Sequence, residues 1–351
     1  MPWFAAALLA VAAWRAEGFS RALRAERDSV PGEGAVQGQS ILTTYVTVGL
    51  AGFRGIVAEA LWLRVAWLQD HSRYLELVQL SEWISALDPH SADAWTYQAW
   101  NMAYNVSSVL PDARDRWRWV EHGVVLLRER AIPMNPQESR LYRELGWMFQ
   151  HKIGSDLDRA HETYKLAFLD EIAPLLGPGG AAPEPGTGAA DALRDNLRLD
   201  AGLMREIESR FGPLDWRVPA THAVYWATRA LALAKPGGFD ETAARRMVHQ
   251  SLTALVTEGR FAGDGADGRW ATEPNPALIP GTCAAFEEEL ALAPTTGTAT
   301  AYGAFLITAT KLCKASNAAA ARLYYSRLRE LPLEGVEIPP FDDLPAWVRP
   351  R

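Results

Sequence analysis

Apolar residues recur at helical spacing along most of the chain from residue 52 to residue 331. Large and small apolar positions three and four residues apart define one face of an α-helix. The only β-branched run, Ile41 to Val48, is short. The pattern therefore predicts an all-α fold with almost no strand.

Breaks in this pattern divide the first half of the chain into helical hairpins. Three are predicted, over residues 57–87, 92–130 and 136–176. The turns inside them are expected at residues 71–72, 107–111 and 154–155. Asp88-Pro89 and Asn135-Pro136 separate the hairpins, because proline cannot continue a helix and restricts the residue before it. The first hairpin fits the apolar spacing poorly and is expected to be a divergent cap.

The second half begins after a segment rich in glycine, proline and alanine, residues 177–190. Such composition is typical of a linker or a long exposed loop. Helices are expected from 190 to 210 and from 222 to 234, and a loop from 260 to 280. The last hairpin is expected between 300 and 331. The predicted domains after residue 50 are repeats over 51–176, the linker over 177–190, a second helical block over 191–335, and a tail over 336–351.

The N-terminal part has a different pattern. Trp3 to Trp14 is an unbroken apolar run, shorter than the roughly twenty residues of a spanning helix. With a start further upstream it would form a single membrane anchor over residues 1–28, followed by a flexible spacer over 29–50. By the positive-inside rule, the arginines after the run favour a cytoplasmic location for the end of the segment that they follow, but acidic residues lie among them. A buried first helix is the alternative, and the side of the membrane stays undecided.

Three stretches share one spacing of large and small residues. A large residue, a small one four later and a large one three after that describe one helix, and Ala-x-x-x-Tyr-x-x-(Ala/Leu) describes a partner helix. The predicted packing positions are Trp95, Ala99, Tyr142, Gly146, Phe149, Ala160, Tyr164, Ala167, Phe305, Ala309, Ala321 and Tyr325. Gly146 is expected to lie where the two helices of one hairpin touch and to face Tyr164 or its neighbours.

This spacing resembles the tetratricopeptide repeat. The resemblance implies an α-solenoid of helical hairpins, here in two blocks, with a concave groove that holds a peptide or helix of another protein. The two proline marks, which are the breaks at Pro89 and Pro136, lie 47 residues apart. The usual period of the repeat is about 34 residues, so the helices are longer or the turns carry insertions. The chain also resembles bacterial proteins that combine one N-terminal span with degenerate repeats, best over residues 50–176, a likeness that implies no activity.

Two clusters are candidates for contact with a partner. By the resemblance, Tyr97, Asn101 and Tyr104 would line the groove, because non-consensus residues of a first helix do so in this family. Further core is the alternative for these side chains. Arg116 and Arg118 alternate with tryptophans and could bind anionic or aromatic ligands. The alternative for them is an amphipathic helix with snorkelling arginines.

Composition narrows the function classes. The 351 residues carry a net charge of −7, which argues against nucleic-acid binding through phosphate neutralisation. Fourteen tryptophans can fill gaps between helices, or line a groove that grips peptide or sugar. Cys283 and Cys313 are too few for a disulfide framework or a metal site, and either two buried thiols or one bridge is open.

The sequence contains no pattern typical of catalysis, metal binding or a cofactor. It has no Walker loop, no nucleophile elbow and no zincin motif. The glycine- and aspartate-rich segment 263–268 lacks the ligand spacing of a calcium loop and is predicted to be a polar turn. We therefore expect a non-enzymatic, membrane-tethered scaffold of a bacterial envelope assembly that binds other proteins. The alternatives are an α/α-toroid that cleaves carbohydrate with paired carboxylates, and a purely structural subunit.

Overall fold

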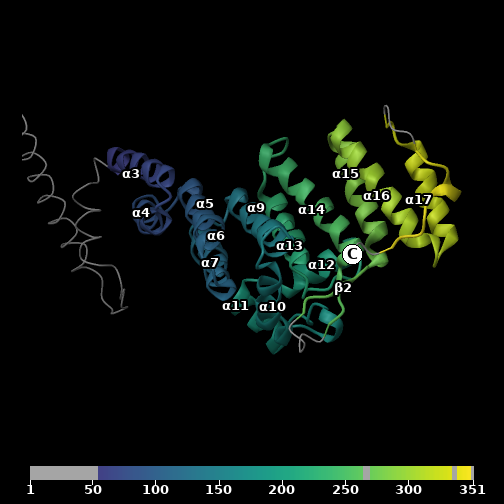
Figure 1. Ribbon diagram of the computed structural model, residues 1–351, viewed down its shortest axis with the longest axis horizontal. Helices are drawn as coiled ribbons and strands as arrows, with labels where there is room; N and C mark the ends of the chain where they lie inside the picture. Colours follow the sequence, from purple (N-terminus) through teal and green to yellow (C-terminus); the bar gives the residue numbers. More distant parts are fainter. Residues whose placement is uncertain (1–53, 264–268, 334–337, 349–351) are drawn as a thin grey trace, which may run out of the picture. The chain divides into compact units, whose positions relative to one another are not determined.

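The computed structural model describes residues 54–263, 269–333 and 338–348 of the chain (Figure 1). The contacts divide the chain into two compact units, Met1–Pro89 and His90–Arg351. The described residues are mostly helical, so the prediction of an all-α fold is confirmed. The expected anchor over residues 1–28, the spacer over 29–50 and most of the 263–268 turn lie outside the described residues.

The described part of the first unit is one helical hairpin. Helices α3 (Arg54–Asp70) and α4 (Tyr74–Leu87) are joined by a turn in which Ser72 takes a φ of 54°. The predicted break at residues 71–72 is therefore confirmed. Val65 and Leu68 of α3 are each 2% exposed, and Leu77 and Ile84 of α4 are no more exposed, so the two helices bury their apolar faces in this unit.

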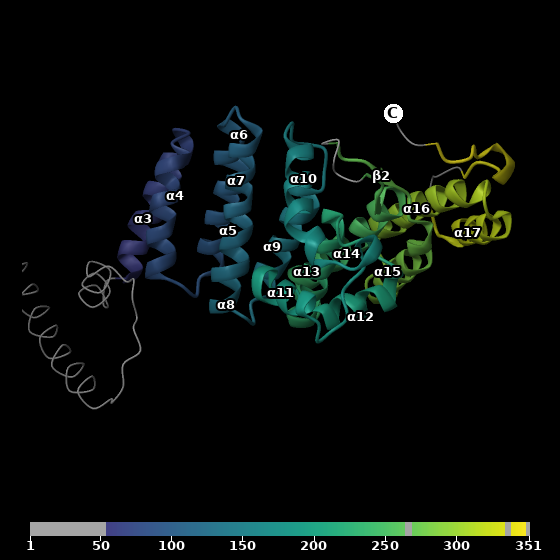
Figure 2. The same ribbon diagram turned by 90° about the horizontal axis from the view of Figure 1, so that it is seen from below.

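The second unit begins with two long composite helices, and the third of the predicted hairpins follows them (Figure 2). The first composite helix comprises α5 (Ala92–Trp100), η1 (Asn101–Val106) and α6 (Ser107–Val109). The second comprises α7 (Ala113–Val125), η2 (Leu126–Ala131) and α8 (Ile132–Met134). The third hairpin comprises α9 (Ser139–Trp147), η3 (Met148–Ile153) and α10 (His161–Ile172). The break before α7 covers residues 110–112 and so overlaps only the end of the predicted 107–111 turn, because Ser107–Val109 is still helical and Asp112 caps α7. The break after Ile153 begins at the predicted residues 154–155.

Each of these three long helices contains a π-helical segment, which the apolar spacing does not predict. The segments η1, η2 and η3 are six residues long, and each directly follows an α-helix. A π-turn places more residues in a turn than an α-turn and shifts the register of the side chains that follow it. Such segments are often found at functional sites.

Residues 177–190, expected to be a linker or a long exposed loop, lie within the second compact unit. The segment contains the short helix η5 (Pro178–Gly180), which follows η4 (Ala173–Leu175). The backbone N–H of Trp216 donates to the Gly180 carbonyl at 2.8 Å, and Ala182 is 3% exposed. The segment is therefore packed inside the second unit, and the boundary between the two units lies after Pro89.

The helix expected over residues 190–210 is two helices, α11 (Gly188–Leu197) and α12 (Ala201–Phe211). Arg198 ends α11 in the left-handed region, and the Asp200 carboxylate accepts the N–H of Leu203 to cap α12. The rest of the unit contains α13 (Pro219–Leu233), α14 (Phe239–Glu258), η6 (Pro276–Leu278), α15 (Ile279–Leu292), α16 (Thr296–Lys314), α17 (Ala318–Glu330) and η7 (Phe341–Asp343). Strands β1 (Arg260–Phe261) and β2 (Thr272–Glu273) form one short antiparallel pair in the expected loop.

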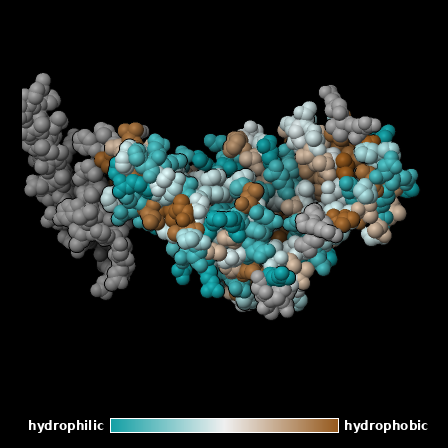
Figure 3. All heavy atoms as spheres, viewed as in Figure 1, coloured by the Kyte–Doolittle hydropathy of each residue, from teal (hydrophilic) through white to brown (hydrophobic). Residues whose placement is uncertain are grey.

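Helix α13 lies at the centre of the second unit, where it packs on both α9 and α14 (Figure 1). Tyr225 and Trp226 of α13, and Trp216 shortly before it, are among the largest fully buried side chains of the described residues. Helices α16 and α17 form a second close pair. Because Trp216 and Trp226 are buried, the tryptophans serve in part as core, as large aromatics do between helices. On the face of the molecule in Figure 3, hydrophobic residues form separate patches among hydrophilic ones.

Most of the predicted packing positions are buried. Those at most 5% exposed are Trp95, Ala99, Tyr142, Phe149, Ala160, Tyr164, Phe305, Ala309 and Ala321. Ala167 and Tyr325 are partly exposed. In the last hairpin Tyr324 is buried instead, and the Tyr325 hydroxyl donates to the Pro339 carbonyl at 2.8 Å, so the predicted helix face is off by one residue.

Gly146 is in a tight contact, but not the predicted one. A Cβ at this position would lie 2.8 Å from Sδ of Met247 and 3.3 Å from Cβ of Trp226. The expectation that Gly146 faces Tyr164 is therefore wrong, because α9 turns this face toward α13 and α14 rather than toward α10. The close contact inside the neighbouring pair is made by Gly123, whose Cβ would meet the Ala99 carbonyl at 2.8 Å.

No helix in the part of the chain that the structure describes combines the length and apolarity needed to cross a membrane.

Candidate functional site

A groove lies between α5, the α9–η3 helix and α14, which are neighbours in both Figure 1 and Figure 2. We call it the aromatic groove. Its volume is about 390 Å³, and it is lined by Trp100, Arg143, Glu144, Trp147, Gln150, Phe239, Thr242, Ala243, Arg246, Met247 and Gln250. Small-ligand sites begin at roughly 300 Å³, so the groove has room for a small molecule or a few side chains of a partner.

Local helix geometry brings these side chains to one place. Trp100 is the last residue of α5 and Trp147 the last residue of α9, and each directly precedes a π-helical segment. The lining residues of α14 lie at positions 239, 242–243, 246–247 and 250, and this three- to four-residue recurrence places them on one helix face. The groove is thus formed by one face of α14 and by the two helix positions where α turns into π.

A chain of polar contacts crosses the groove wall. Trp100 Nε1 donates to Glu144 Oε2 at 2.9 Å, and Glu144 pairs with Arg143 at 2.8 Å. Arg143 in turn donates through Nε to Asp240 Oδ1 at 2.8 Å. The buried Glu144 carboxylate is therefore neutralised, and these contacts hold α5, α9 and α14 in register.

Arg246 on the same wall is exposed and forms no ion pair with any residue that the structure describes. Phe239, at the N-terminus of α14, is 76% exposed. The groove therefore presents a cation, an exposed ring and two indole rings to whatever enters it.

An aromatic stack supports the two tryptophans from behind. Tyr104 stacks on Trp100 with ring centroids 4.5 Å apart, and His151 stacks on Trp147 at 4.7 Å. The Tyr104 hydroxyl lies 3.4 Å from Nδ1 of His151 and closes the set. Burial lowers the pKa of His151, helped by the charge of Lys152, so this ring is neutral at pH 7. Burial also raises the pKa of Tyr104.

Beside this stack lies a buried ion cluster. The Asp158 carboxylate pairs with Lys152 at 2.7 Å and with Arg116 at 3.0 Å, and all three side chains are at most 10% exposed. Burial lowers the pKa of Lys152 and raises that of Tyr164 to about 12. The cluster is poorly accessible, and its two ion pairs tie α7, η3 and the loop before α10 together.

The residues predicted to contact a partner are not gathered in the groove. Asn101 is 1% exposed and accepts a hydrogen bond from the Asn105 amide, and Arg116 is 6% exposed. Neither can contact a partner in this structure, because each is buried in a polar network. Tyr97 is partly exposed, Tyr104 supports Trp100, and Arg118 is exposed in an ion pair with Asp115.

Most lining residues of the groove are absent from the sequence prediction. Trp147 follows Trp100 by 47 residues, the same distance that separates the two proline marks, and that spacing is the signal that pairs them. No comparable signal links α14 to α9, since their contact depends on how the two helices fold against each other.

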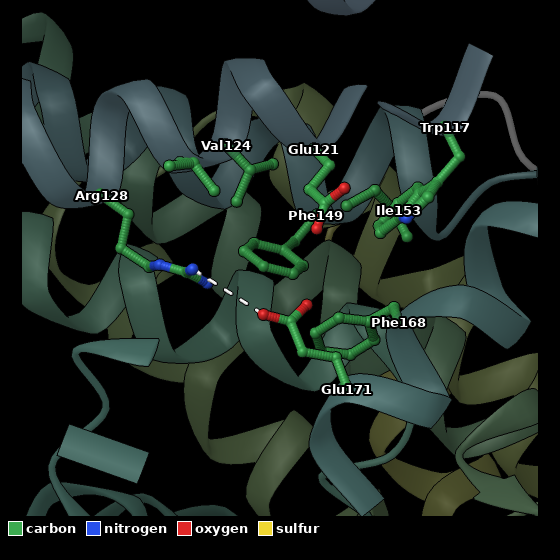
Figure 4. Close-up of a pocket in the computed structure, with 9 residues that line it drawn as sticks. Trp117, Glu121, Val124, Arg128, Phe149, Ile153, Phe168 and Glu171 are labelled. Carbon is green, nitrogen blue, oxygen red and sulfur yellow. Dashed lines mark ion pairs between the residues drawn. The ribbon is translucent and has the colours of Figure 1, made fainter. Parts of the chain in front are cut away.

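A second, much smaller cavity brings two carboxylates together (Figure 4). Glu121 and Glu171 line it beside the rings of Phe149 and Phe168, with Arg128 3.8 Å from Glu171. Burial raises the pKa of Glu171. The cavity measures about 10 Å³, roughly the room that one water molecule needs. It cannot admit a sugar ring, so this acid pair gives no support to carbohydrate cleavage.

Within the described residues, no group of three His, Cys, Asp or Glu side chains is placed to hold a metal ion. Cys283 and Cys313 are both free and buried, which answers the question of a bridge between them. Burial raises the pKa of both thiols, so neither is an activated nucleophile.

Compared with known proteins, the chain matches no family model, no curated protein sequence and no solved structure.

Proposed function

We propose that this chain is a non-enzymatic scaffold that holds a segment of another protein in the aromatic groove. The helix pairs would act as tetratricopeptide-like hairpins of a solenoid, and residues 1–28 would tether the scaffold to a membrane in a bacterial envelope assembly. The observation that carries the proposal is the groove itself, an open trough lined by two indole rings with an unpaired arginine beside them.

The chemistry of the wall suggests what the bound segment contains. Trp100, Trp147 and Met247 offer an apolar surface for one large side chain, as interface anchors require. Arg246 offers a charge for an acidic neighbour of that side chain. We therefore propose a segment with a large apolar residue next to an aspartate or glutamate.

A peptide selection tests this directly. Peptides from a random display library would be selected on the full-length protein, and the binding of the enriched peptides measured by fluorescence polarisation. We expect an apolar residue beside an acidic one to be enriched. Gln250→Trp, which fills the groove from an exposed position, should abolish binding, whereas Gln137→Trp at an exposed position outside it should not.

Charge reversal gives a second readout. Arg246→Glu should weaken the same peptides roughly tenfold, equivalent to about 1.4 kcal/mol. Arg329→Glu, an exposed arginine of α17, is the matched control and should leave binding unchanged. Peptides that bind Gln250→Trp and Arg246→Glu as well as the parent would contradict the proposal and favour a purely structural subunit.

The tether is tested separately. It rests on the apolar run from Trp3 to Trp14. Deleting residues 1–28 should release the protein from membranes and leave the helical content of the remaining chain intact by circular dichroism. A deletion product that still sediments with membranes at high salt would contradict the tether without affecting the groove.

A further inference from the structure

We infer that another pocket, formed by arginines from three helical segments, binds a phosphate group. This arginine pocket has a volume of about 260 Å³. Arg128 of η2, Arg194 and Arg198 at the end of α11, and Arg229 of α13 line it, together with the rings of Tyr142 and Trp226. The pocket is distinct from the aromatic groove, and the inference does not depend on the proposed scaffold function.

The acidic groups around the pocket leave one arginine without a counter-charge. Glu129 pairs with Arg128 at 2.8 Å and with Arg198 at 2.7 Å, and Asp191 pairs with Arg194 at 2.8 Å. Arg229 forms no ion pair with any residue that the structure describes.

Asp200 also lines the wall, but its carboxylate is engaged as the N-cap of α12 and accepts the Leu203 N–H at 2.7 Å. The half-buried Arg229 guanidinium therefore borders an open cavity without a direct ion pair among the described residues, although buried charges in proteins are ordinarily paired.

Arg229 is held in place by aromatic rings rather than by a carboxylate. Its guanidinium lies 5.2 Å from the centre of the Tyr142 ring, a cation–π distance. The Tyr142 hydroxyl donates to the Pro136 carbonyl at 3.0 Å, which fixes that ring. The planar donors of Arg229 are therefore pre-positioned at the pocket, and arginine matches the geometry of a phosphate with two parallel hydrogen bonds.

A second unsatisfied donor belongs to the same wall. Trp226 is 2% exposed, and its Nε1–H is buried without an acceptor in the described part of the chain. Buried donors without an acceptor are rare in folded proteins and call for an explanation such as an unseen ligand. Trp226 lines the arginine pocket together with Arg229, so a phosphate bound there would lie beside the indole ring.

Nuclear magnetic resonance of the indole N–H groups tests the inference on the full-length protein. The Trp226 resonance would be assigned by its loss in Trp226→Phe. Inorganic phosphate should shift it saturably, and sodium chloride at equal ionic strength should not. Phenyl phosphate at equal concentration distinguishes a site for the free ion from a site for a phosphate on an organic molecule, and tighter binding of the ester would favour the latter.

Variants supply the decisive comparison. Arg229→Met keeps the packing on Tyr142 but removes the charge, and should weaken phosphate roughly tenfold or more, as expected for a lost charge-assisted hydrogen bond. Arg205→Met, outside the pocket, should bind like the parent. Arg198→Met, at a half-exposed side chain, replaces Arg229→Met if that variant does not fold. The inference is overturned if phosphate leaves the Trp226 resonance unmoved, or moves it equally in the parent and the pocket variants.

Discussion

The carboxylate of Asp158 lies 2.7 Å from the ammonium group of Lys152, and neither side chain is more than one-tenth exposed. Arg116 approaches the same carboxylate from α7 at 3.0 Å. One acidic group thus pairs with two buried cations on different helices, and its loss would leave both without an ion-pair partner among the described residues.

Asp158→Asn should therefore be strongly destabilising. Removing one partner of a buried ion pair typically costs about 3–5 kcal/mol, because the remaining charges stay desolvated. Urea denaturation followed by circular dichroism measures the change. Asp115→Asn breaks the exposed pair with Arg118 and should cost roughly 1 kcal/mol or less. If the two variants were equally stable, the buried cluster would not hold these helices together.

The same group predicts a dependence on pH. Burial alone would raise the pKa of Asp158, but hydrogen bonds from Lys152 and the Ala160 N–H, with the charge of Arg116, hold it below its ordinary value of 3.8. The stabilisation is thus fully present above that value and is lost as the pH falls through the lower pKa of the folded state. The difference in unfolding free energy between the parent and Asp158→Asn should be constant near neutral pH and shrink in acid. A difference that does not change with pH would show that Asp158 is not ionised in the fold.

Gly146 lies in a tight contact between α9, α13 and α14, so a larger side chain at this position should lower the stability of the protein. Gly146→Leu would drive side-chain atoms into Met247 and Trp226, where even a Cβ lies 2.8 Å from sulfur. Such overpacking typically costs about 1–3 kcal/mol. Gly297→Ala in α16 is the control, because its Cβ meets nothing closer than 3.9 Å, and it should be neutral or slightly stabilising. A Gly146→Leu variant that melts like the parent would show that α9 does not pack against these helices.

Replacing Tyr97, Asn101 and Tyr104 together with alanine should lower the melting temperature rather than only abolish binding. Asn101 is buried, and Tyr104 supports Trp100 through its stacked ring. Truncation of fully buried aromatics costs about 3–5 kcal/mol, and a smaller loss is expected for a half-buried ring. Differential scanning calorimetry of the triple variant and of Arg118→Ala would compare the two clusters. An unchanged melt of the triple variant would place these side chains at the surface.

The sequence alone determined the helices and most of their ends. The apolar spacing and the proline and glycine breaks act locally, so the turns at residues 71–72 and 154–155, and the end of the one expected at 107–111, could be predicted without any knowledge of the tertiary structure. Burial of Trp95, Ala99 and Tyr142 follows from the same periodicity, since one face of an amphipathic helix must be covered.

What covers each face was decided only by tertiary structure. Gly146 meets α13 and α14 instead of α10, residues 177–190 pack inside the second unit, and three π-helical segments shift the register of long helices. The aromatic groove and the arginine pocket each join helices far apart in the sequence. Nothing in the local spacing specifies which helices meet, because that choice depends on how all the side chains of the unit pack together.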